Sequence, residues 1–417
     1  MSEQPLHLLV LSGWAGVPEA ALALGFDVSF IGDTTEFSAD DREILACCRF
    51  VHETPADRTA AVLAAARRIH EAQPLHAAVS FGEFGTESSA VVADALGIRG
   101  LSLNTVAATH YKDLMRDLLA GHPGLALAWA RVTDPAGLRK FHARQGVPMV
   151  IKPVSGAGSV GVRQILTEEE LWATLDDDRF WREGPYLAEE FVPGDMVYSV
   201  ETVTLGGRHH IAGVSAGRLS THPNLAITEI SVPPPPPYDT PLPEISRTVL
   251  AFLDVLGHDW GLTHTEVKIA ADGRPVVIES QPRIGGMRIW RMVEHATGVD
   301  EIGTVLRSLL PDGADVSSPH LPPYTAVGKC LSLTPPRKRV RATADPGLLR
   351  GIEGVEDFEI SIRPGEVPAP VTDNSGGRPG LIWLRLPDHA AAEQVQKEIS
   401  RTYWVEYEDG DVWHPSF

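Results

Sequence analysis

Cysteine, long apolar runs and positive charge are all scarce in this chain of 417 residues. Its three cysteines, Cys47, Cys48 and Cys330, form neither a disulfide framework nor a zinc-ligand pattern, which favours a reducing compartment. The apolar run Leu8–Leu11 is far too short to cross a membrane, and no other apolar run is as long as a membrane-spanning helix. The first residues carry no basic region or signal core. We therefore expect a cytoplasmic protein without a membrane partner.

Acidic residues outnumber basic ones by 55 to 36, which leaves a formal net charge of −19. Nucleic-acid phosphates would be repelled by this charge, so no nucleic-acid partner is expected. The one basic cluster, residues 337–341, is typical of a solvated loop or strand edge, with an anion-binding patch as the alternative. A hydrophobic content of 43% is ordinary for a globular protein, and the length allows two or three domains.

Strand and helix signals alternate over the first hundred residues. Apolar runs at 6–11, 26–31 and 77–81 predict strands, and helical patterns lie at 18–24, 59–70 and 88–96. Strands separated by helices of this length predict parallel β-α-β units. We expect an α/β domain over residues 1–104.

Mixed α and β signals fill the remainder of the chain. One helix is expected from about 105 to 121, begun by Asn104 or Thr105. A small α+β unit over 127–205 contains a helix begun by a capping box of Thr167 and Glu170. We expect this unit to be the lid of a central domain over 105–315.

Later signals divide the chain further. The prolines at 233–237 predict a stiff connection, with a ligand for a proline-binding module as the alternative. A helix at 242–256 precedes two strands, 263–270 and 275–280, which Asp272-Gly273 joins as a hairpin. Proline pairs then break the chain into short strands, so we expect an α+β portion over 316–417.

A glycine-rich run directly after Lys152 is the first feature that carries chemistry. Glycines allow backbone conformations closed to other residues, so that amide groups can close over phosphate oxygens, and serine hydroxyls add donors. The residues are Ser155, Gly156, Gly158, Ser159 and Gly161. Because the lysine precedes the glycines, the run is neither the Gly-Lys-Ser/Thr nucleotide loop nor a dinucleotide fingerprint. Alone, it would fit a structural hairpin equally well.

Two acids on the expected hairpin strengthen the nucleotide interpretation. Glu266 and Glu279 lie on antiparallel neighbours, where they can face one another. Two carboxylates with the carbonyl of Gln281 suit Mg²⁺, which keeps water and phosphate in its other positions. Alternation places Glu279, Gln281 and Arg283 on one side, where Arg283 could hold a phosphoryl group or a carboxylate. The alternative is a solvated strand.

Candidates for substrate contacts are less specific. Gly285, Gly286 and Arg288 could bind a carboxylate, and Glu83, after a parallel strand, could hold an ammonium group or cap a helix. His222 and Glu229 flank a loop that could line an acceptor pocket. Exposed loop positions are the alternative for these residues.

In combination, these motifs resemble the ATP-grasp superfamily, most closely its carboxylate–amine ligases of the L-amino acid ligase type, over roughly residues 1–310. The resemblance implies an N-terminal parallel-sheet domain, a two-part α+β clamp for ATP and a C-terminal portion. It implies that Lys112 and Lys152 contact the phosphates, that residues 155–161 cover them, and that Glu266 and Glu279 hold Mg²⁺ (Mn²⁺ as an alternative). Gln281 stands where the family usually has asparagine.

The same resemblance assigns further roles. It places the adenine hinge at Glu189, Glu190, Phe191 and Val192, with the Val192 amide reading the base. Asp195 is the expected ribose contact, with Glu201 as a competitor, since the segment after the hinge is one residue longer than usual. Arg283 would lie near the reacting phosphoryl group, and Arg288 would meet the acyl substrate.

The implied reaction is ATP-dependent ligation of a carboxylate to an amine through an acylphosphate, with amino acids as the expected substrates and a homodimer as the expected assembly. Two alternatives share the nucleotide residues. One is a carboxylase or synthetase of the biotin or purine type, and the other is a nucleotide-binding protein without catalysis.

Overall fold

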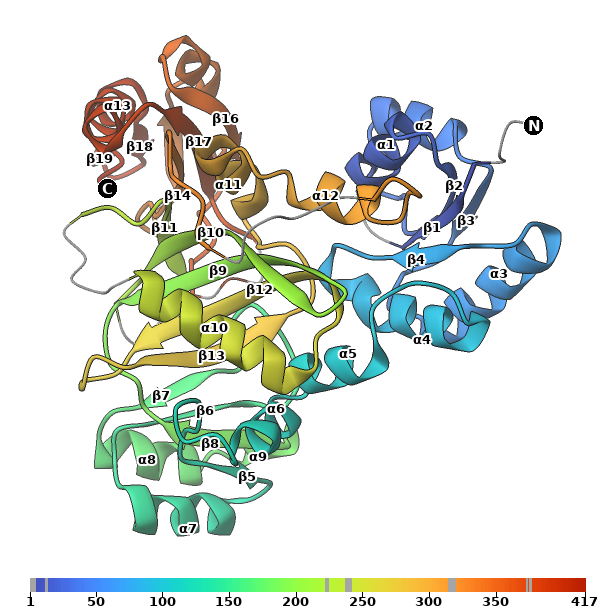
Figure 1. Cartoon of the computed structure of the whole chain (residues 1–417). Coiled ribbons are helices and arrows are strands. Elements are labelled where there is room, and N and C mark those ends of the chain that lie inside the picture. The colour runs from blue at the N-terminus through green and yellow to red at the C-terminus, as the bar shows by residue number, and fades with distance from the viewer. Residues whose placement is uncertain are drawn as a thin grey trace.

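The computed structural model describes residues 5–11, 14–221, 225–236, 242–313, 320–372, 374 and 377–417. Figure 1 shows an N-terminal α/β domain on one side of a large central sheet, a small lid below that sheet, and a C-terminal portion above it. None of the helices within the described ranges is both long and apolar enough to cross a membrane.

The N-terminal domain is a parallel sheet in the order β3-β2-β1-β4, as the alternating signals predicted. Helices cover its faces, and Gly97 ends the last of them in the left-handed conformation at φ 64°. The elements are β1 (His7–Leu11), α1 (Gly16–Ala23), β2 (Asp27–Gly32), α2 (Ala39–Ala46), β3 (Phe50–Glu53), α3 (Thr59–Ala72), β4 (Ala77–Val79), the 3₁₀ turn η1 (Glu83–Gly85) and α4 (Thr86–Leu96).

Two helices replace the single helix expected over 105–121. The side chain of Ser102, not Asn104 or Thr105, caps α5 (Leu103–His110), and α6 (Lys112–Leu119) follows after an extended Tyr111. The backbone N–H of Lys112 donates to Val154 O at 2.9 Å, in the segment after strand β6. The break therefore ties the start of α6 to the glycine-rich run.

The lid is a four-stranded sheet in the order β5-β8-β6-β7 with helices on one side. The expected capping box of Thr167 and Glu170 begins α8. The elements are β5 (Trp129–Val132), α7 (Pro135–Gln145), β6 (Met149–Pro153), β7 (Arg163–Ile165), α8 (Glu168–Leu175), α9 (Asp178–Arg182) and β8 (Tyr186–Glu190). Residues 196–205, expected in this unit, pair instead with strands of the central sheet.

The central sheet has eight strands in the order β13-β12-β9-β10-β11-β14-β17-β16. The helix α10 lies on one face, where its apolar side packs into a cluster with Val200, Val214 and Val267. The elements are β9 (Met196–Leu205), β10 (Arg208–Leu219), β11 (Ile227–Val232), α10 (Leu242–Leu256), β12 (Trp260–Ile269), β13 (Pro275–Gln281), α11 (Ile289–Thr297) and α12 (Glu301–Arg307).

The C-terminal portion continues this sheet rather than forming a separate layer. Strand β14 pairs with β11, and β17 and β16 extend the sheet beyond it. The remaining elements pack behind these strands around Leu349, Ile399 and Tyr403. The elements are β14 (Val327–Leu333), β15 (Val340–Thr343), the 3₁₀ turn η2 (Pro346–Gly351), β16 (Val355–Ile360), β17 (Gly380–Leu386), α13 (His389–Thr402), β18 (Val405–Tyr407) and β19 (Val412–Trp413).

The basic cluster at 337–341 lies at the surface beside acids of the C-terminal end. Lys338 contacts Asp409 and Asp411, and Arg341 lies 3.0 Å from Glu406. This arrangement agrees with the solvated strand edge expected from the sequence.

Candidate active site

The two acids of the hairpin face one another across β12 and β13. Glu266 is the register partner of Glu279, as the hairpin predicted. Gln281 Nε2 donates to Glu279 Oε1 at 2.8 Å, so these alternate residues do share one side of β13. The ammonium of Lys112 lies 3.3 Å from Glu279 Oε2. Burial would raise the pKa of Glu279, but Lys112 and Lys152 outweigh it and lower the pKa to about 2.

A β-bulge beside Glu279 supports this arrangement. The register shifts between Glu266 and Val267, which leaves Ile278 as the extra residue of β13. Its carbonyl accepts from Lys152 Nζ at 3.3 Å and from Arg116 at 3.0 Å. Bulges locally free backbone groups and redirect side chains, and they are common beside active sites.

A buried charge cluster joins the lid to the central sheet below the acids. Glu189 on β8 accepts from Arg116 Nε at 2.5 Å and from Lys152 Nζ at 2.6 Å. Burial would raise the pKa of Glu189, yet the two cations hold it below its usual value. Burial lowers the pKa of Lys152, although Glu189 opposes that effect. The lysine is thus held in place by a carboxylate beneath the glycine-rich run.

The glycine-rich run forms the loop expected of it. Gly158 and Gly161 have φ values of 67° and 73°, in the region that favours glycine. Ser159 adopts φ 63° despite its side chain, at a cost of roughly 1 kcal/mol or more. Lys112 Nζ donates to Gly156 O at 2.8 Å, so one lysine touches both the loop and an acid of the hairpin.

One residue of the C-terminal portion reaches this loop. The backbone N–H of Asn374 donates to Gly158 O at 2.8 Å, and its Oδ1 accepts from Ile227 N at 2.8 Å. Arg378 holds the same oxygen at 2.6 Å. The loop is therefore anchored to a segment more than two hundred residues later in the chain.

A cavity between the lid and the central sheet joins the hinge to the acids. Its walls include Lys152, Ser159, Glu266 and Glu279, together with the expected hinge residues Glu189, Glu190, Phe191 and Val192. Lys268 fixes the hinge by donating to Val192 O at 2.9 Å and to Gly194 O at 2.8 Å. Apolar walls with a few convergent polar groups are typical of small-molecule sites.

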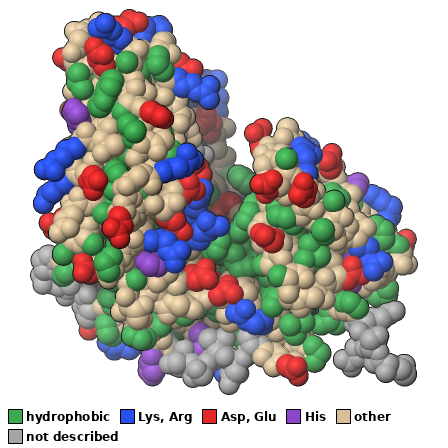
Figure 2. Space-filling model, turned by 90° about the horizontal axis from the view of Figure 1, so that it is seen from above, with side chains coloured by type: hydrophobic (Ala, Val, Ile, Leu, Met, Phe, Trp, Pro, Cys, Tyr) green, Lys and Arg blue, Asp and Glu red, His purple; other side chains and the backbone are tan. Residues whose placement is uncertain are grey.

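A second cavity of about 470 Å³ continues on the other side of the acids. It is lined by the glycine loop, by Glu266 and Glu279, and by Glu83, Arg283 and Gly286. Arg283 Nε donates to Glu83 Oε2 at 2.7 Å, so the structure brings these two expected substrate residues together. Viewed from above, the surface is hollowed between its two lobes, and charged side chains lie on the rim (Figure 2).

Buried polar groups also support Glu266 from behind. His264 Nδ1 lies 2.6 Å from Glu201 Oε1, and its Nε2 lies 3.7 Å from Glu266 Oε1. Burial would lower the pKa of His264, but Glu201 reverses the effect and raises it to about 9. Burial and Glu201 raise the pKa of Glu301, on α12, well above its usual value.

The acids fit a magnesium ion that also binds phosphate. No group of three or more His, Cys, Asp or Glu side chains forms a metal cage among the described residues. Two facing carboxylates suit Mg²⁺, since this ion keeps several waters and nucleotide oxygens as ligands. The buried Gln281 Oε1 accepts no hydrogen bond from any described residue. It is therefore an oxygen available to such an ion or to a water bound to it.

Two expected residues already have other partners. Arg288 stacks over Trp383 at 3.9 Å and binds Asp357 and Glu359 at 2.6 and 2.7 Å, so its charge is already compensated. Asp195 is exposed and pairs with Arg218 at 3.2 Å.

Two further candidates also have other surroundings, and a third is not described. Glu201 is fully buried against His264, which removes it as the competing ribose contact. Glu229 binds Lys329 at 2.5 Å instead of lining an acceptor pocket. His222 lies outside the described residues.

The sequence predicted no role in the site for four residues that the structure places there: Arg116, His264, Lys268 and Asn374. Arg116, His264 and Lys268 lie within four residues of Lys112 or Glu266, which the sequence singled out, but their partners lie on distant segments. No local pattern marked Asn374.

Several known proteins are similar to this chain in sequence or in fold. Residues 145–290 match the family model of the ATP-grasp domain. An L-amino acid ligase structure from Bacillus licheniformis aligns with 98% of this chain and 100% of its own at a TM-score of 0.80 and 21% identity. Phosphoribosylglycinamide synthetase from Anaerococcus prevotii aligns over 97% of this chain and 100% of its own at 0.69 and 13%. These likenesses confirm the expected ATP-grasp fold.

Two curated relatives are similar in sequence. The uncharacterized protein y4rH of Sinorhizobium fredii is 27% identical over 306 residues, 70% of this chain and 60% of the relative. The alanine–anticapsin ligase of Bacillus subtilis is 26% identical over 246 residues, 54% of this chain and 51% of the relative. The chain thus spans about half to three fifths of these relatives. The comparisons confirm the expected resemblance to the superfamily and to its L-amino acid ligases.

Proposed function

Because this chain carries an ATP-grasp domain, we propose that it is an ATP-dependent ligase that joins a small carboxylic acid to an amine, with amino acids as both substrates. The observation that carries the proposal is the position of Glu266 and Glu279. They line both the hinge cavity and the cavity that holds Glu83 and Arg283. A nucleotide in the first cavity would therefore direct its terminal phosphate toward an acid in the second.

Each part of the nucleotide has matching groups. The segment Glu189–Val192 would bind the base, with the Val192 amide as its donor. Lys152, Lys112 and the loop from Ser155 to Gly161 would hold the phosphates. Magnesium, bound by Glu266, Glu279 and the oxygen of Gln281, would neutralise charge on the phosphates.

In the first step, the substrate carboxylate attacks the γ-phosphorus, which gives an acylphosphate and ADP. Phosphoryl transfer needs positioning and charge neutralisation rather than a protein nucleophile, and lysines, arginine and backbone amides supply both. Arg283 would lie beside the transferring group. Glu83, held by Arg283 Nε, would orient the ammonium group of an amino-acid substrate.

In the second step, the amine attacks the acyl carbon and phosphate leaves. Arg283 would stabilise the oxyanion of the tetrahedral intermediate. The glycine loop, anchored to Asn374, would exclude water and so protect the acylphosphate from hydrolysis. Gly286, which lines the cavity, would leave room for the acid, whereas a side chain at Gly285 would meet Glu201 and His264.

The test is a scan of paired amino acids for ADP and phosphate release, with mass spectrometry of the products. We expect dipeptides from the wild-type chain and loss of ADP release in Glu279→Ala and Lys152→Ala. Carbon dioxide-dependent turnover would instead indicate a carboxylase, and tight ATP binding without turnover a silent binding protein. Near-normal activity of either variant would refute the assignment.

A further inference from the structure

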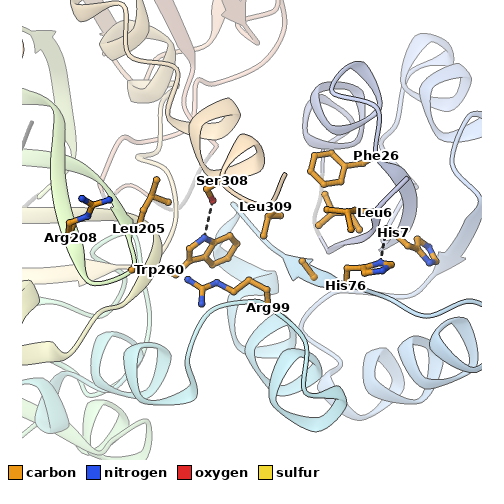
Figure 3. A pocket seen from close by; sticks show the side chains of 13 residues that line it. Leu6, His7, Phe26, His76, Arg99, Leu205, Arg208, Trp260, Ser308 and Leu309 are labelled. Atoms are coloured by element: carbon orange, nitrogen blue, oxygen red, sulfur yellow. Dashed lines mark hydrogen bonds between the residues drawn. The ribbon is translucent and has the colours of Figure 1, made fainter. Parts of the chain in front are cut away.

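A separate cavity of about 470 Å³ lies between the N-terminal domain and the central sheet (Figure 3). It is reached from the amino ends of β1 and β4 and from the turn that joins β9 to β10. Trp260 on its wall and Glu266 at the acids are six residues apart on β12, about 20 Å at roughly 3.3 Å per residue. The cavity is therefore distinct from the proposed active site.

The charge of this cavity opposes that of the whole protein. Its lining contains two arginines, Arg99 and Arg208, and no acidic residue, although the chain has 55 acids and 36 bases. Within the described ranges, neither Arg99 nor Arg208 forms an ion pair or a side-chain hydrogen bond. Free guanidinium groups at the edge of a concave surface suit a carboxylate or phosphate, which they can bind through two parallel hydrogen bonds.

An aromatic ring lies on the wall of the cavity beside Arg99. Trp260 Nε1 donates to Ser308 Oγ at 3.1 Å, which fixes the indole against the end of α12. The guanidinium of Arg99 lies 5.2 Å from the ring centroid, and Leu205 and Leu309 extend the apolar wall. Figure 3 shows Arg99 below the ring of Trp260 and Arg208 farther to the left, beside Leu205. A ligand with an apolar part would have a wall on which to pack.

A third donor has its orientation set by the backbone. His76 Nδ1 accepts from the His7 N–H at 2.9 Å, which leaves the proton of the neutral ring on Nε2. This tautomer presents a donor rather than a lone pair. The cavity is thus lined by three hydrogen-bond donors: the guanidinium groups of Arg99 and Arg208 and the Nε2–H of His76.

We infer that this cavity is a second binding site for a small molecule that pairs an anionic headgroup, carboxylate or phosphate, with an apolar or ring portion. Arg99 belongs to the N-terminal domain and Arg208 to the central sheet, so both parts of the molecule contribute a cation to the site. The inference does not depend on the proposed ligase activity, because its residues are separate from the acids and the glycine loop.

The test measures binding to the full chain by isothermal titration calorimetry, with saturating Mg·ADP present. The probes are phenyl phosphate and phenylacetate, which distinguish the headgroups, and benzyl alcohol, which lacks the charge. The variant is Arg99→Gln with Arg208→Gln. The control, Arg67→Gln with Arg68→Gln, removes the same charge from the exposed face of α3. Thermal denaturation verifies that both variants remain folded.

We expect saturable binding of at least one anionic probe, at least tenfold weaker binding of that probe to the Arg99/Arg208 variant, and unchanged binding to the control. Benzyl alcohol should bind at least tenfold more weakly than that probe. Equal binding by wild type and the Arg99/Arg208 variant would place the probe elsewhere, for example in the cavity that holds Glu83 and Arg283, and would overturn the inference. Absence of saturable binding by either anionic probe would overturn it too, whatever the outcome of the ligase assay.

Discussion

Arg116 shows how much one buried side chain carries at the centre of this molecule. Its guanidinium binds the carboxylate of Glu189 on the lid and the carbonyls of Val277 and Ile278 on β13. The residue is only 1% exposed. A rigid fork of donors suits this geometry, and lysine could not satisfy the same three acceptors.

Removal of this arginine should be costly. Arg116→Met leaves the buried carboxylate of Glu189 with one cation and removes a donor from the carbonyls of Val277 and Ile278, of which Ile278 keeps Lys152. We therefore expect a loss of about 3 kcal/mol or more. A large drop in the urea midpoint would show it. Arg179→Met is the control, since Arg179 forms an exposed pair within α9 that contributes about 1 kcal/mol or less. Equal midpoints for the two variants would contradict the role given to Arg116.

Glu301 offers a residue-scale test that depends on pH. Its side chain is buried on α12, its oxygens have no partner among the described residues, and burial with Glu201 raises its pKa. A carboxyl whose pKa is raised on folding stabilises the fold below its unfolded pKa of about 4.3. That contribution is lost as pH rises through the folded value.

The variant Glu301→Gln removes this titration. We expect its melting temperature, relative to wild type, to rise as pH increases from 5 to 8. Differential scanning calorimetry over that range measures the difference. A constant offset between the two proteins would show that Glu301 does not titrate as its burial implies.

At the scale of elements, the glycine loop depends on a segment that the sequence did not connect with it. Asn374 bridges Gly158, at the loop, and Ile227, at the start of β11. Asn374→Ala keeps the backbone bond to the loop but loses the side-chain anchor, which is worth about 1 kcal/mol.

We therefore expect the KM for ATP to rise about three- to tenfold in Asn374→Ala, with a smaller change in kcat. Asn104→Ala on the exposed side of α5 serves as the matched control. Steady-state kinetics at saturating acid and amine separate the two constants. Identical KM values for the two variants would mean that the loop closes without this anchor.

Local signals allowed part of these elements to be predicted. The hairpin of β12 and β13 has its turn residues between its strands, so the facing of Glu266 and Glu279 depends on contacts close in sequence. The break at Tyr111 has no proline or glycine to mark it, and it results from a bond between Lys112 and Val154. The bulge at Ile278 likewise depends on Arg116, which is 162 residues away.

At the scale of the whole molecule, the C-terminal portion is a structural part of the central sheet. Strand β14 pairs with β11 from Glu229–Leu331 to Val232–Gly328. Cys330 and Trp383 are buried in one cluster with Met292 of α11. A sequence pattern can predict these strands, but it does not specify which of two sheets a strand joins, because its partners are distant in the chain.

A chain that ends at Gly313 should therefore fail to fold. It would leave β11 as a long unpaired edge and expose the apolar cluster beneath α11, which favours aggregation. A chain that ends at Glu408 loses only β19 and should remain soluble. Size-exclusion chromatography and circular dichroism of the two distinguish them. A cooperative unfolding transition in the shorter chain would disprove the dependence.

The stacking of Arg288 on Trp383, with Asp357 and Glu359 as its partners, has a consequence for how the proposed ligase could diversify. The arginine follows directly after Gly285, Gly286 and Met287. It lines a hollow together with Glu83 and Arg283, beside the cavity proposed for the acid substrate. Substitutions of Asp357 or Glu359 on β16 would move Arg288 and so reshape this hollow. The residues proposed to bind the nucleotide phosphates would stay unchanged. Acid selectivity could thus drift through the tail of the chain at little cost to nucleotide chemistry.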